Sequence, residues 1–454
     1  MTMLHRWGRE GRRIAGLRRW GFALLPGILF AAASTPEAAF AQVQATDIDN
    51  VRAITVDEAV EIALRRNPTL LQAFSSIEMA EHNRLSAFGQ LLPSVNMNFG
   101  YQNSSTGRID PLGEGIVATS YSTRLTASYN LFNGWSRFTD LKGARLGVVE
   151  QNARYREVEF QVIQQVKSQY AATVAARELV SVEQRRVQRQ ADQLEFVRQQ
   201  LELGRATRSD SLRSQVDLNN ARLALLNAEN NARTTTFRLT EAVGSETLVG
   251  PIAGAELAET PITFTRDELF AMADVSAPSL QSTSAAVEAA EAAVSSARSG
   301  YLPSIFIGGG WGWSNQEFPP SNRSWQFSLT GSYPLFNGFQ RETQVFRARA
   351  TADQARQSER AAQLNISSEL DARYATAQSA LAGVDLASQN VELSEESLRV
   401  VQERYRLGLA TILELQDAQI TLTQAEVDLV TGRFDYEVAV AAIEALLGRR
   451  LDQP

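Results

Sequence analysis

The chain has 454 residues, of which 44% are apolar and 21% charged, and its formal net charge is −7. This composition can bury a core, and the excess of acid argues against nucleic-acid binding. Because the chain has no cysteine and only two histidines, His5 and His82, it lacks the residues for a disulfide, a thiolate metal site or a histidine dyad. With no phosphate-binding loop either, we expect no enzyme activity, no metal and no cofactor.

Residues 1–41 have the three parts of a secretory signal peptide. Arginines between Arg6 and Arg19 form a basic region, Trp20–Ala33 is apolar, and Ala39-Phe40-Ala41 is a small-residue cleavage site. We therefore expect export from the cytoplasm. No apolar run of about 18 residues follows, so no transmembrane helix is expected.

The next segment changes its hydrophobic period from 3.6 to 2. Residues 55–90 have a helical pattern that breaks at Asn67-Pro68. Residues 94–102 and 121–132 then alternate apolar and polar side chains, with a polar loop expected at about 103–120. Two strands of about ten residues with one apolar face are typical of an outer-membrane barrel. They are equally typical of a hairpin on a soluble helical domain.

A helical hairpin follows the strands. Residues 135–203 contain no proline, and their heptad spacing indicates a coiled coil of on the order of 100 Å. Gly204 can take the left-handed conformation that ends a helix. Thr207 and Asp210 then have the spacing of a capping box that begins the next helix, to about Val243.

The second half of the sequence repeats the first. Leu302-Pro303-Ser304 corresponds to Leu92-Pro93-Ser94, and the turn 405–417 corresponds to 201–213, with Gly408, Thr411 and Glu414 in the capping positions. Each half therefore reads as helix, β-hairpin, long helix, turn and helix. The predicted division is a signal peptide 1–41, a first repeat 42–245 (β-hairpin 94–132, coiled-coil hairpin 133–245), a linker 246–264, a second repeat 265–448 (β-hairpin 304–336, coiled-coil hairpin 337–448) and a tail 449–454.

Four strands in one chain cannot close a membrane barrel, and an open sheet edge is not tolerated in lipid. If the strands span a membrane, the chain must therefore oligomerise. Two chains would supply eight strands, whose interior is filled by side chains, whereas three chains would supply twelve strands around an open lumen. The long helices would continue such a barrel as a tube, which favours a conduit.

Three pairs of motifs resemble the TolC family of outer-membrane efflux proteins across nearly all of residues 50–448. The pairs are Leu131-Phe132-Asn133-Gly134 with Leu335-Phe336-Asn337-Gly338, Leu92-Pro93-Ser94 with Leu302-Pro303-Ser304, and the two Leu-Gly-x-Ala-Thr turns. The resemblance implies an α+β membrane protein that forms a homotrimer, with a twelve-stranded barrel in outer-membrane lipid and an α-helical tunnel in the periplasm. It also implies docking to a periplasmic adaptor and an inner-membrane ABC or RND transporter, for drug efflux or type I protein secretion.

The resemblance further implies a gate at the periplasmic mouth. Glu414 and Asp417 match two acidic rings, and Tyr405 and Asp210 match a latch that holds the inner coils shut. The family's gate arginine is Ala410 here, which leaves the arginine part of the latch in doubt. From the residues alone, Glu414 and Asp417 can also serve only as a helix cap and a dipole partner, and Tyr405 can be a packing residue of the heptad seam.

The two turns project furthest from the predicted membrane strands and are the expected adaptor-docking surface. They comprise Gly204, Arg205, Ala206, Thr207, Gly408, Leu409, Ala410 and Thr411. A periplasmic adaptor and a structural coiled-coil protein of an export system remain as alternatives. An adaptor has a single hairpin, however, and a structural coiled coil does not need amphipathic strands.

Overall fold

The computed structural model describes residues 51–109, 116–255, 257 and 261–451, and the side chains of 105–118 are left aside. All of these residues belong to one compact unit that begins at Ile48. The predicted signal peptide, residues 1–41, lies outside the described residues.

The unit begins with a short strand and two helices whose ends follow from local capping. β1 is Arg52–Ile54, α1 is Val56–Arg66 and α2 is Pro68–Gly89. Thr55 caps α1 by accepting a hydrogen bond from the Glu58 amide, and Asn67 caps α2 in the same way through Thr69. Since Pro68 lacks an amide hydrogen, it fits the first position of α2 and separates the two helices.

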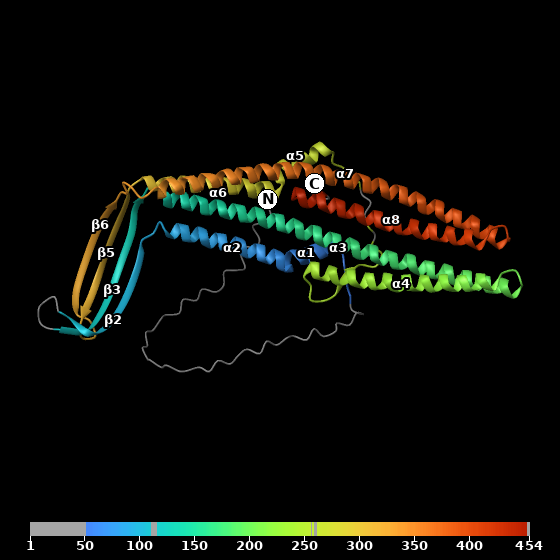
Figure 1. Cartoon of the computed structure of the whole chain (residues 1–454), viewed down its shortest axis with the longest axis horizontal. Helices are drawn as coiled ribbons and strands as arrows, with labels where there is room; N and C mark the ends of the chain where they lie inside the picture. The colour runs from blue at the N-terminus through green and yellow to red at the C-terminus, as the bar shows by residue number, and fades with distance from the viewer. Residues whose placement is uncertain (1–50, 110–115, 256, 258–260, 452–454) are drawn as a thin grey trace. The chain divides into compact units, whose positions relative to one another are not determined.

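Two long helical hairpins form most of the unit (Figure 1). α3 (Ser136–Glu202) returns as α4 (Arg208–Val243), and α7 (Gln340–Arg406) returns as α8 (Ile412–Leu447). Both outgoing helices have 67 residues and both returning helices have 36. α3 packs against α2, α4, α6 and α8, so it links the two hairpins. A 67-residue helix spans on the order of 100 Å.

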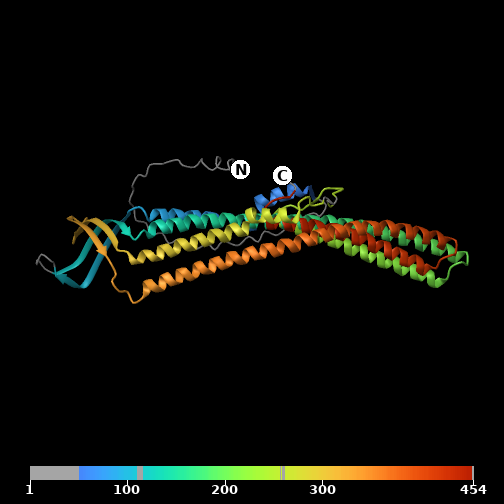
Figure 2. The ribbon, with the colours of Figure 1, turned by 90° about the horizontal axis from the view of Figure 1, so that it is seen from above.

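Between the two hairpins the chain forms three shorter helices. α5 is Arg266–Ser276, α6 is Pro278–Arg298 and the short 3-10 helix η1 is Ser299–Tyr301. α6 runs beside both α3 and α7. In Figures 1 and 2 it lies along the same stretch of α3 as α2 but on another side.

Four antiparallel strands form one sheet in the order β2-β3-β5-β6. The strands are β2 (Ser94–Ile109), β3 (Ile116–Asn133), β5 (Ser304–Asn315) and β6 (Asn322–Ser332). Because α3 follows β3 directly and ends at the first turn, the sheet and that turn lie at opposite ends of α3 (Figure 1).

The strand boundaries correct two predictions. The polar segment 103–120 was expected to be a loop, but β2 continues to Ile109 and β3 starts at Ile116, with a register shift between Asn103 and Arg108. Cross-strand hydrogen bonds outweigh the loop-like Asn, Ser, Thr and Gly composition. In the second hairpin β6 ends at Ser332 rather than Phe336, because Pro334 cannot donate a ladder hydrogen bond.

A small parallel pairing lies inside the segment expected as a linker. β4 (Val249–Pro251) pairs with β1, with Ala53 opposite Gly250. Arg177 of α3 donates a hydrogen bond to the Pro251 carbonyl at 2.6 Å, and Tyr170 donates one to the Ile54 carbonyl at 3.2 Å. Three-residue strands are too short to leave a periodic pattern in the sequence.

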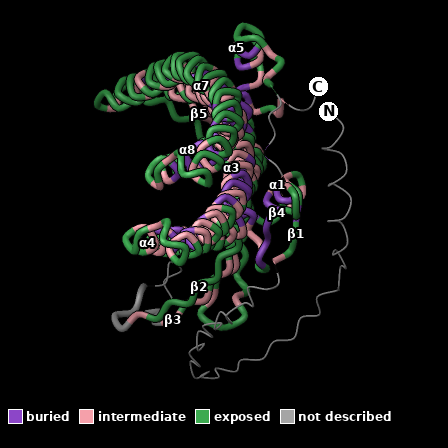
Figure 3. The backbone as a smooth tube through the Cα atoms, turned by 90° about the vertical axis from the view of Figure 1, so that its right-hand side faces the viewer, coloured by how far each residue is buried: buried purple, intermediate pink, exposed green. Residues whose placement is uncertain are grey.

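The buried core consists of separate clusters along the helices. The largest joins α1, α3, α4 and the β1–β4 pair, and includes Val166, Leu239 and Val243, all fully buried. Figure 3 shows burial concentrated on α3, whereas α7 is exposed over much of its length. Within the part of the chain that the structure describes, no helix combines the length and the apolar character that crossing a bilayer requires.

Candidate functional site

The two turns between the long helices are built on left-handed glycines. Gly204 has φ +72° and Gly408 has φ +77°, and no atom would approach a Cβ at either position within 4 Å. The requirement for glycine is therefore conformational. The amide of Arg205 returns to the Gln200 carbonyl at 2.8 Å, and that of Leu409 to the Arg404 carbonyl at 2.7 Å, so each turn satisfies the last carbonyls of its helix.

Each returning helix begins with a reciprocal capping box. The Asp210 carboxylate accepts hydrogen bonds from the Thr207 amide at 2.9 Å and hydroxyl at 2.7 Å, while the Asp210 amide donates to the Thr207 hydroxyl. Thr411 and Glu414 repeat this arrangement at the second turn. The Thr207 hydroxyl and amide lower the pKa of Asp210 below its ordinary value. Asp210 and Glu414 thus both act as helix caps.

Tyr405 lies on the seam between α7 and α8 and also reaches α3. It packs against the cluster of Leu398, Leu415, Ala418 and Leu422. Its ring lies 5.8 Å from that of Phe196 on α3. Burial raises the pKa of its hydroxyl, the Asp210 carboxylate raises the pKa further, and the Gln193 amide lowers it.

The structure therefore brings Tyr405 within electrostatic range of Asp210. Among the hydrogen bonds of the described residues, none joins the Tyr405 hydroxyl to the Asp210 carboxylate, which is bonded to Thr207. Tyr405, Asp210 and Gln193 together form a small polar contact between the two hairpins.

One cation at the second turn was missed in the sequence. Arg404 Nη1 lies 3.6 Å from the Glu414 carboxylate, and Nη2 donates to the Leu409 carbonyl at 3.2 Å. Arg404 precedes the turn, whereas Ala410, where the resemblance led us to expect a gate arginine, follows it. No motif marks Arg404, because its contact depends on the turn folding back.

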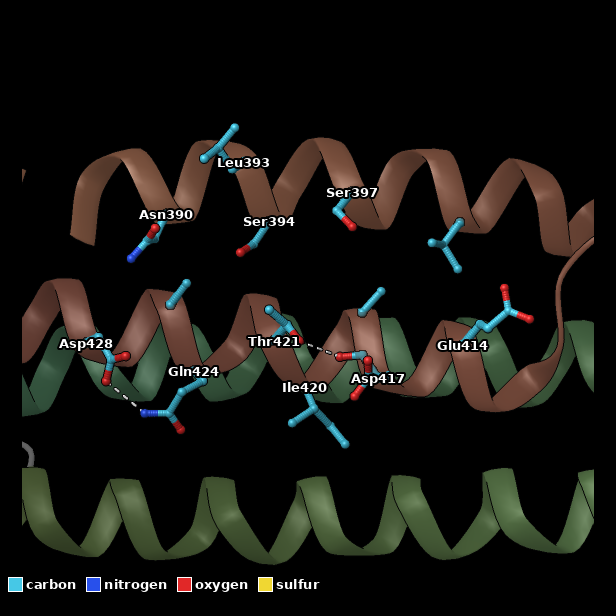
Figure 4. Close-up of a pocket in the computed structure, with 13 residues that line it drawn as sticks. Asn390, Leu393, Ser394, Ser397, Glu414, Asp417, Ile420, Thr421, Gln424 and Asp428 are labelled. Carbon is cyan, nitrogen blue, oxygen red and sulfur yellow. Dashed lines mark hydrogen bonds between the residues drawn. The ribbon is translucent and has the colours of Figure 1, made fainter. Parts of the chain in front are cut away.

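Glu414 and Asp417 line an open groove of about 710 Å³ between α7 and α8, which has both polar and apolar lining residues. Figure 4 shows Asn390, Ser394 and Ser397 of α7 pointing toward α8. The polar side chains that α8 contributes to the groove are Glu414, Asp417, Thr421, Gln424 and Asp428. Their spacing of three and four residues places them in one stripe along the helix. Three carboxylates therefore lie along one wall.

A second set of polar contacts, which sequence reasoning also missed, ties α8 to α3. Glu426 is only 8% exposed, and its carboxylate accepts hydrogen bonds from Arg185 at 2.9 and 3.1 Å and from Arg189 at 3.1 Å. Gln190 donates to Gln419 at 2.9 Å. Heptad analysis found the apolar seam but had no signal for partners more than 200 residues apart.

The surface around the turns is apolar and exposed. Leu203, Leu407 and Leu409 are each about two-thirds exposed or more, and Leu212 and Leu413 are more than half exposed. Leucines that no described residue covers at a helix tip are suited to contact with another protein.

The comparisons with known proteins agree with this arrangement. The model of the outer membrane efflux protein family matches residues 59–245 and 269–449. The outer membrane efflux protein BepC of Brucella suis is 21% identical over 87% of this chain and 85% of its own length. The outer membrane protein TolC of Vibrio cholerae is 23% identical over 86% of this chain and 90% of its own length.

A solved structure shows the same fold. The outer membrane protein VceC of Vibrio cholerae superposes with a TM-score of 0.74 over 87% of this chain and 97% of its own, at 17% identity. Since the family model covers most of the sequence, including both helical hairpins and all four long strands, the chain belongs to the outer membrane efflux protein family: it is a non-enzymatic outer-membrane channel of an export system, extending into the periplasm.

Proposed function

We propose that three copies of this chain form a channel that passes exported substrates across the outer membrane. The observation that carries the proposal is the two-faced sheet. Its register places Val95, Met97 and Phe99 of β2 on the same face as Leu125, Trp311 and Trp325, all exposed, whereas the opposite face is polar. An apolar face toward lipid and a polar face toward water is the pattern of a membrane barrel.

The apolar face also has the surface that lipid requires. Val95, Leu125, Trp311, Trp325 and Phe327 line a groove of about 640 Å³ on it. In water such a surface would promote aggregation, whereas acyl chains cover it without cost. Twelve strands from three chains leave an open lumen, and the outer edges of β2 and β6 pair with neighbouring copies.

The equal lengths of the paired helices support a duplicated unit. α3 and α7 have 67 residues each, α4 and α8 have 36 each, and each pair ends in a glycine turn with a capping box. Three copies of two such hairpins make a tunnel of twelve helices. The alternatives, a periplasmic adaptor and a structural coiled-coil protein, gain no support from the family match.

The carboxylates of Glu414, Asp417 and Asp428 along the groove between α7 and α8 support a gate at the free end of the tunnel. In a trimer Glu414 and Asp417 would form two acidic rings at the mouth and favour cations. Tyr405 and Asp210 would act as the latch, because they lie between the movable α7–α8 hairpin and the α3–α4 hairpin. Arg404, which lies 3.6 Å from the Glu414 carboxylate, would supply the positive charge of the latch in place of the arginine expected at Ala410.

The exposed leucines at the turns support docking to a periplasmic adaptor, which would link the tunnel to an inner-membrane ABC or RND transporter. The docking surface comprises Gly204–Thr207 and Gly408–Thr411 with the leucines that flank them. The cargo, drug or secreted protein, is set by that transporter.

The latch is tested by conductance in a planar bilayer. The change Tyr405→Phe combined with Asp210→Ala removes the hydroxyl and the carboxylate between the hairpins, and we expect the open fraction to rise several-fold. The matched control is Glu268→Ala, which removes the acid of the capping box at the start of α5 and should leave the open fraction near that of the wild type. An unchanged open fraction in the latch double variant would rule out the latch.

Alkaline pH gives the latch a second signature. Burial, and then the Asp210 carboxylate, raise the pKa of Tyr405 above its ordinary value of 10.0 where the two hairpins pack together. The neutral phenol therefore stabilises this packing below about pH 10, and the stabilisation is lost as the pH rises through the raised pKa. Conductance should therefore increase above about pH 10, and Tyr405→Phe alone should weaken this increase. A rise of equal size in the phenylalanine variant would assign it to other tyrosines.

A further inference from the structure

The polar face of the sheet carries one charge among its described side chains. Counting from the register, this face presents serine, asparagine, glutamine, threonine and glycine on all four strands, with Phe306 as an apolar exception. Arg124, near the middle of β3, is the exception in charge. Arg323 of β6 pairs with Trp313 and so belongs to the opposite, apolar face.

Arg124 lies in a row that runs across the whole sheet. Asn98 of β2 is opposite it on one side and Gly312 of β5 on the other, and Gly312 is in turn opposite Ser324 of β6. None of these neighbours is charged. Arg124 is exposed, and the described residues offer it no ion pair or hydrogen bond. Its charge is therefore available to a solute.

The glycines of β5 leave space beside this arginine. A small hollow of about 60 Å³ is lined by Arg124, Gly310, Gly312, Ser324 and Gln326, together with Trp311 and Trp325, whose positions in the register belong to the apolar face. A Cβ at Gly310 would lie 2.8 Å from the Leu125 carbonyl, and a Cβ at Gly312 would lie 2.9 Å from the Ser324 hydroxyl. The site thus combines a guanidinium with a hydroxyl and an amide around a floor without side chains, which suits an anionic group.

We propose that Arg124 is a specificity-determining residue that attracts anionic groups, such as carboxylates or phosphates, inside the barrel. This rests on the proposed channel, in which the polar face lines the lumen and three copies of Arg124 form a ring. The ring opposes the acidic mouth: cations are favoured at Glu414 and Asp417, and anions at Arg124. Cargo that carries both charges is attracted at each end of the path.

The test uses the absence of cysteine from the chain. Ser324→Cys places a single thiol in the row of Arg124. The trimer, reconstituted in liposomes, is treated with a negatively and a positively charged methanethiosulfonate of similar size, and the two rates of modification are measured. We expect the anionic reagent to react preferentially, and Arg124→Gln to lower the anion-to-cation rate ratio roughly tenfold. About 1 M salt should reduce the preference as well.

Two controls separate the ring from a general change. Arg323→Gln removes the same charge one residue from the thiol but on the apolar face, and should leave the ratio nearly unchanged. A thiol at Ser332→Cys, on the same face of β6 and about 26 Å further along, should not respond to Arg124→Gln.

The possible failures differ for the inference and the channel. If the Ser324→Cys thiol reacts and Arg124→Gln leaves the ratio unchanged, the inference is wrong while the lumen stands. If that thiol resists both reagents, the polar face does not line a water-filled lumen, and both proposals are overturned.

Discussion

Two glycines at the junctions between strand and helix have similar backbone angles but differ in the space that a side chain would have. Gly134 precedes α3 with φ +65° and Gly338 precedes α7 with φ +62°. A Cβ at Gly134 would lie 2.4 Å from the Ser299 carbonyl oxygen, whereas no atom lies within 4 Å of one at Gly338. Trp135 and Phe339, which follow, also have positive φ angles. Each junction therefore contains two consecutive residues with left-handed backbone.

We predict that Gly134→Ala is the more destabilising of the two substitutions. Gly338→Ala costs only the left-handed backbone, about 1–2 kcal/mol, while Gly134→Ala adds a steric clash of about 1–3 kcal/mol. The measurement is the free energy of unfolding of the detergent-solubilised protein in denaturant. Equal losses for the two variants would show that the junction at Gly134 relaxes around the added methyl group.

The elements could be predicted where the determinants are local. Asn67-Pro68, Gly204 and Gly408 fixed helix ends within a residue or two, because capping and left-handed backbone depend on near neighbours. The strand segments at 103–109 and 116–120 were missed because their polar residues are stabilised by pairing across the sheet. Glu426 and Arg404 were missed as site residues for the same reason, since their partners meet only in the folded chain.

Glu426 gives a prediction at the level of packed helices. Glu426→Ala removes a buried carboxylate that joins α8 to Arg185 and Arg189 of α3, and we expect a loss of about 2–3 kcal/mol, as for hydrogen bonds to a charged group. The matched control is Glu396→Ala, which breaks the pair with Arg399, where both side chains are more than half exposed. That change should leave the free energy of unfolding nearly unchanged, because water screens an exposed pair. Denaturant unfolding measures the free energy of unfolding of both variants. Similar losses would show that Glu426 contributes no more than an exposed ion pair.

At the scale of the whole molecule, the two ends carry opposite electrostatic features. The α8 stripe carries Glu414, Asp417 and Asp428, and the polar sheet face carries Arg124. The two turns could be read from their glycine and capping-box motifs, whereas the pairing of Glu414 and Asp417 came from the resemblance to the family and stays a prediction. Alternation along residues 121–132 separates Arg124 from the apolar side chains, but the register of all four strands is needed to find that it is the one charge among the described side chains of the polar face.

The most direct test is single-channel recording of the purified mature protein in a planar bilayer, together with the double variant Glu414→Gln and Asp417→Gln. We predict stepwise, cation-selective conductance for the wild type. In the variant, which keeps side chains of similar size but loses the two acidic rings, the reversal potential should move toward that of the anion. Conductance steps with the same selectivity in both proteins would contradict the acidic gate, and the absence of steps from folded trimers of both would contradict the channel itself.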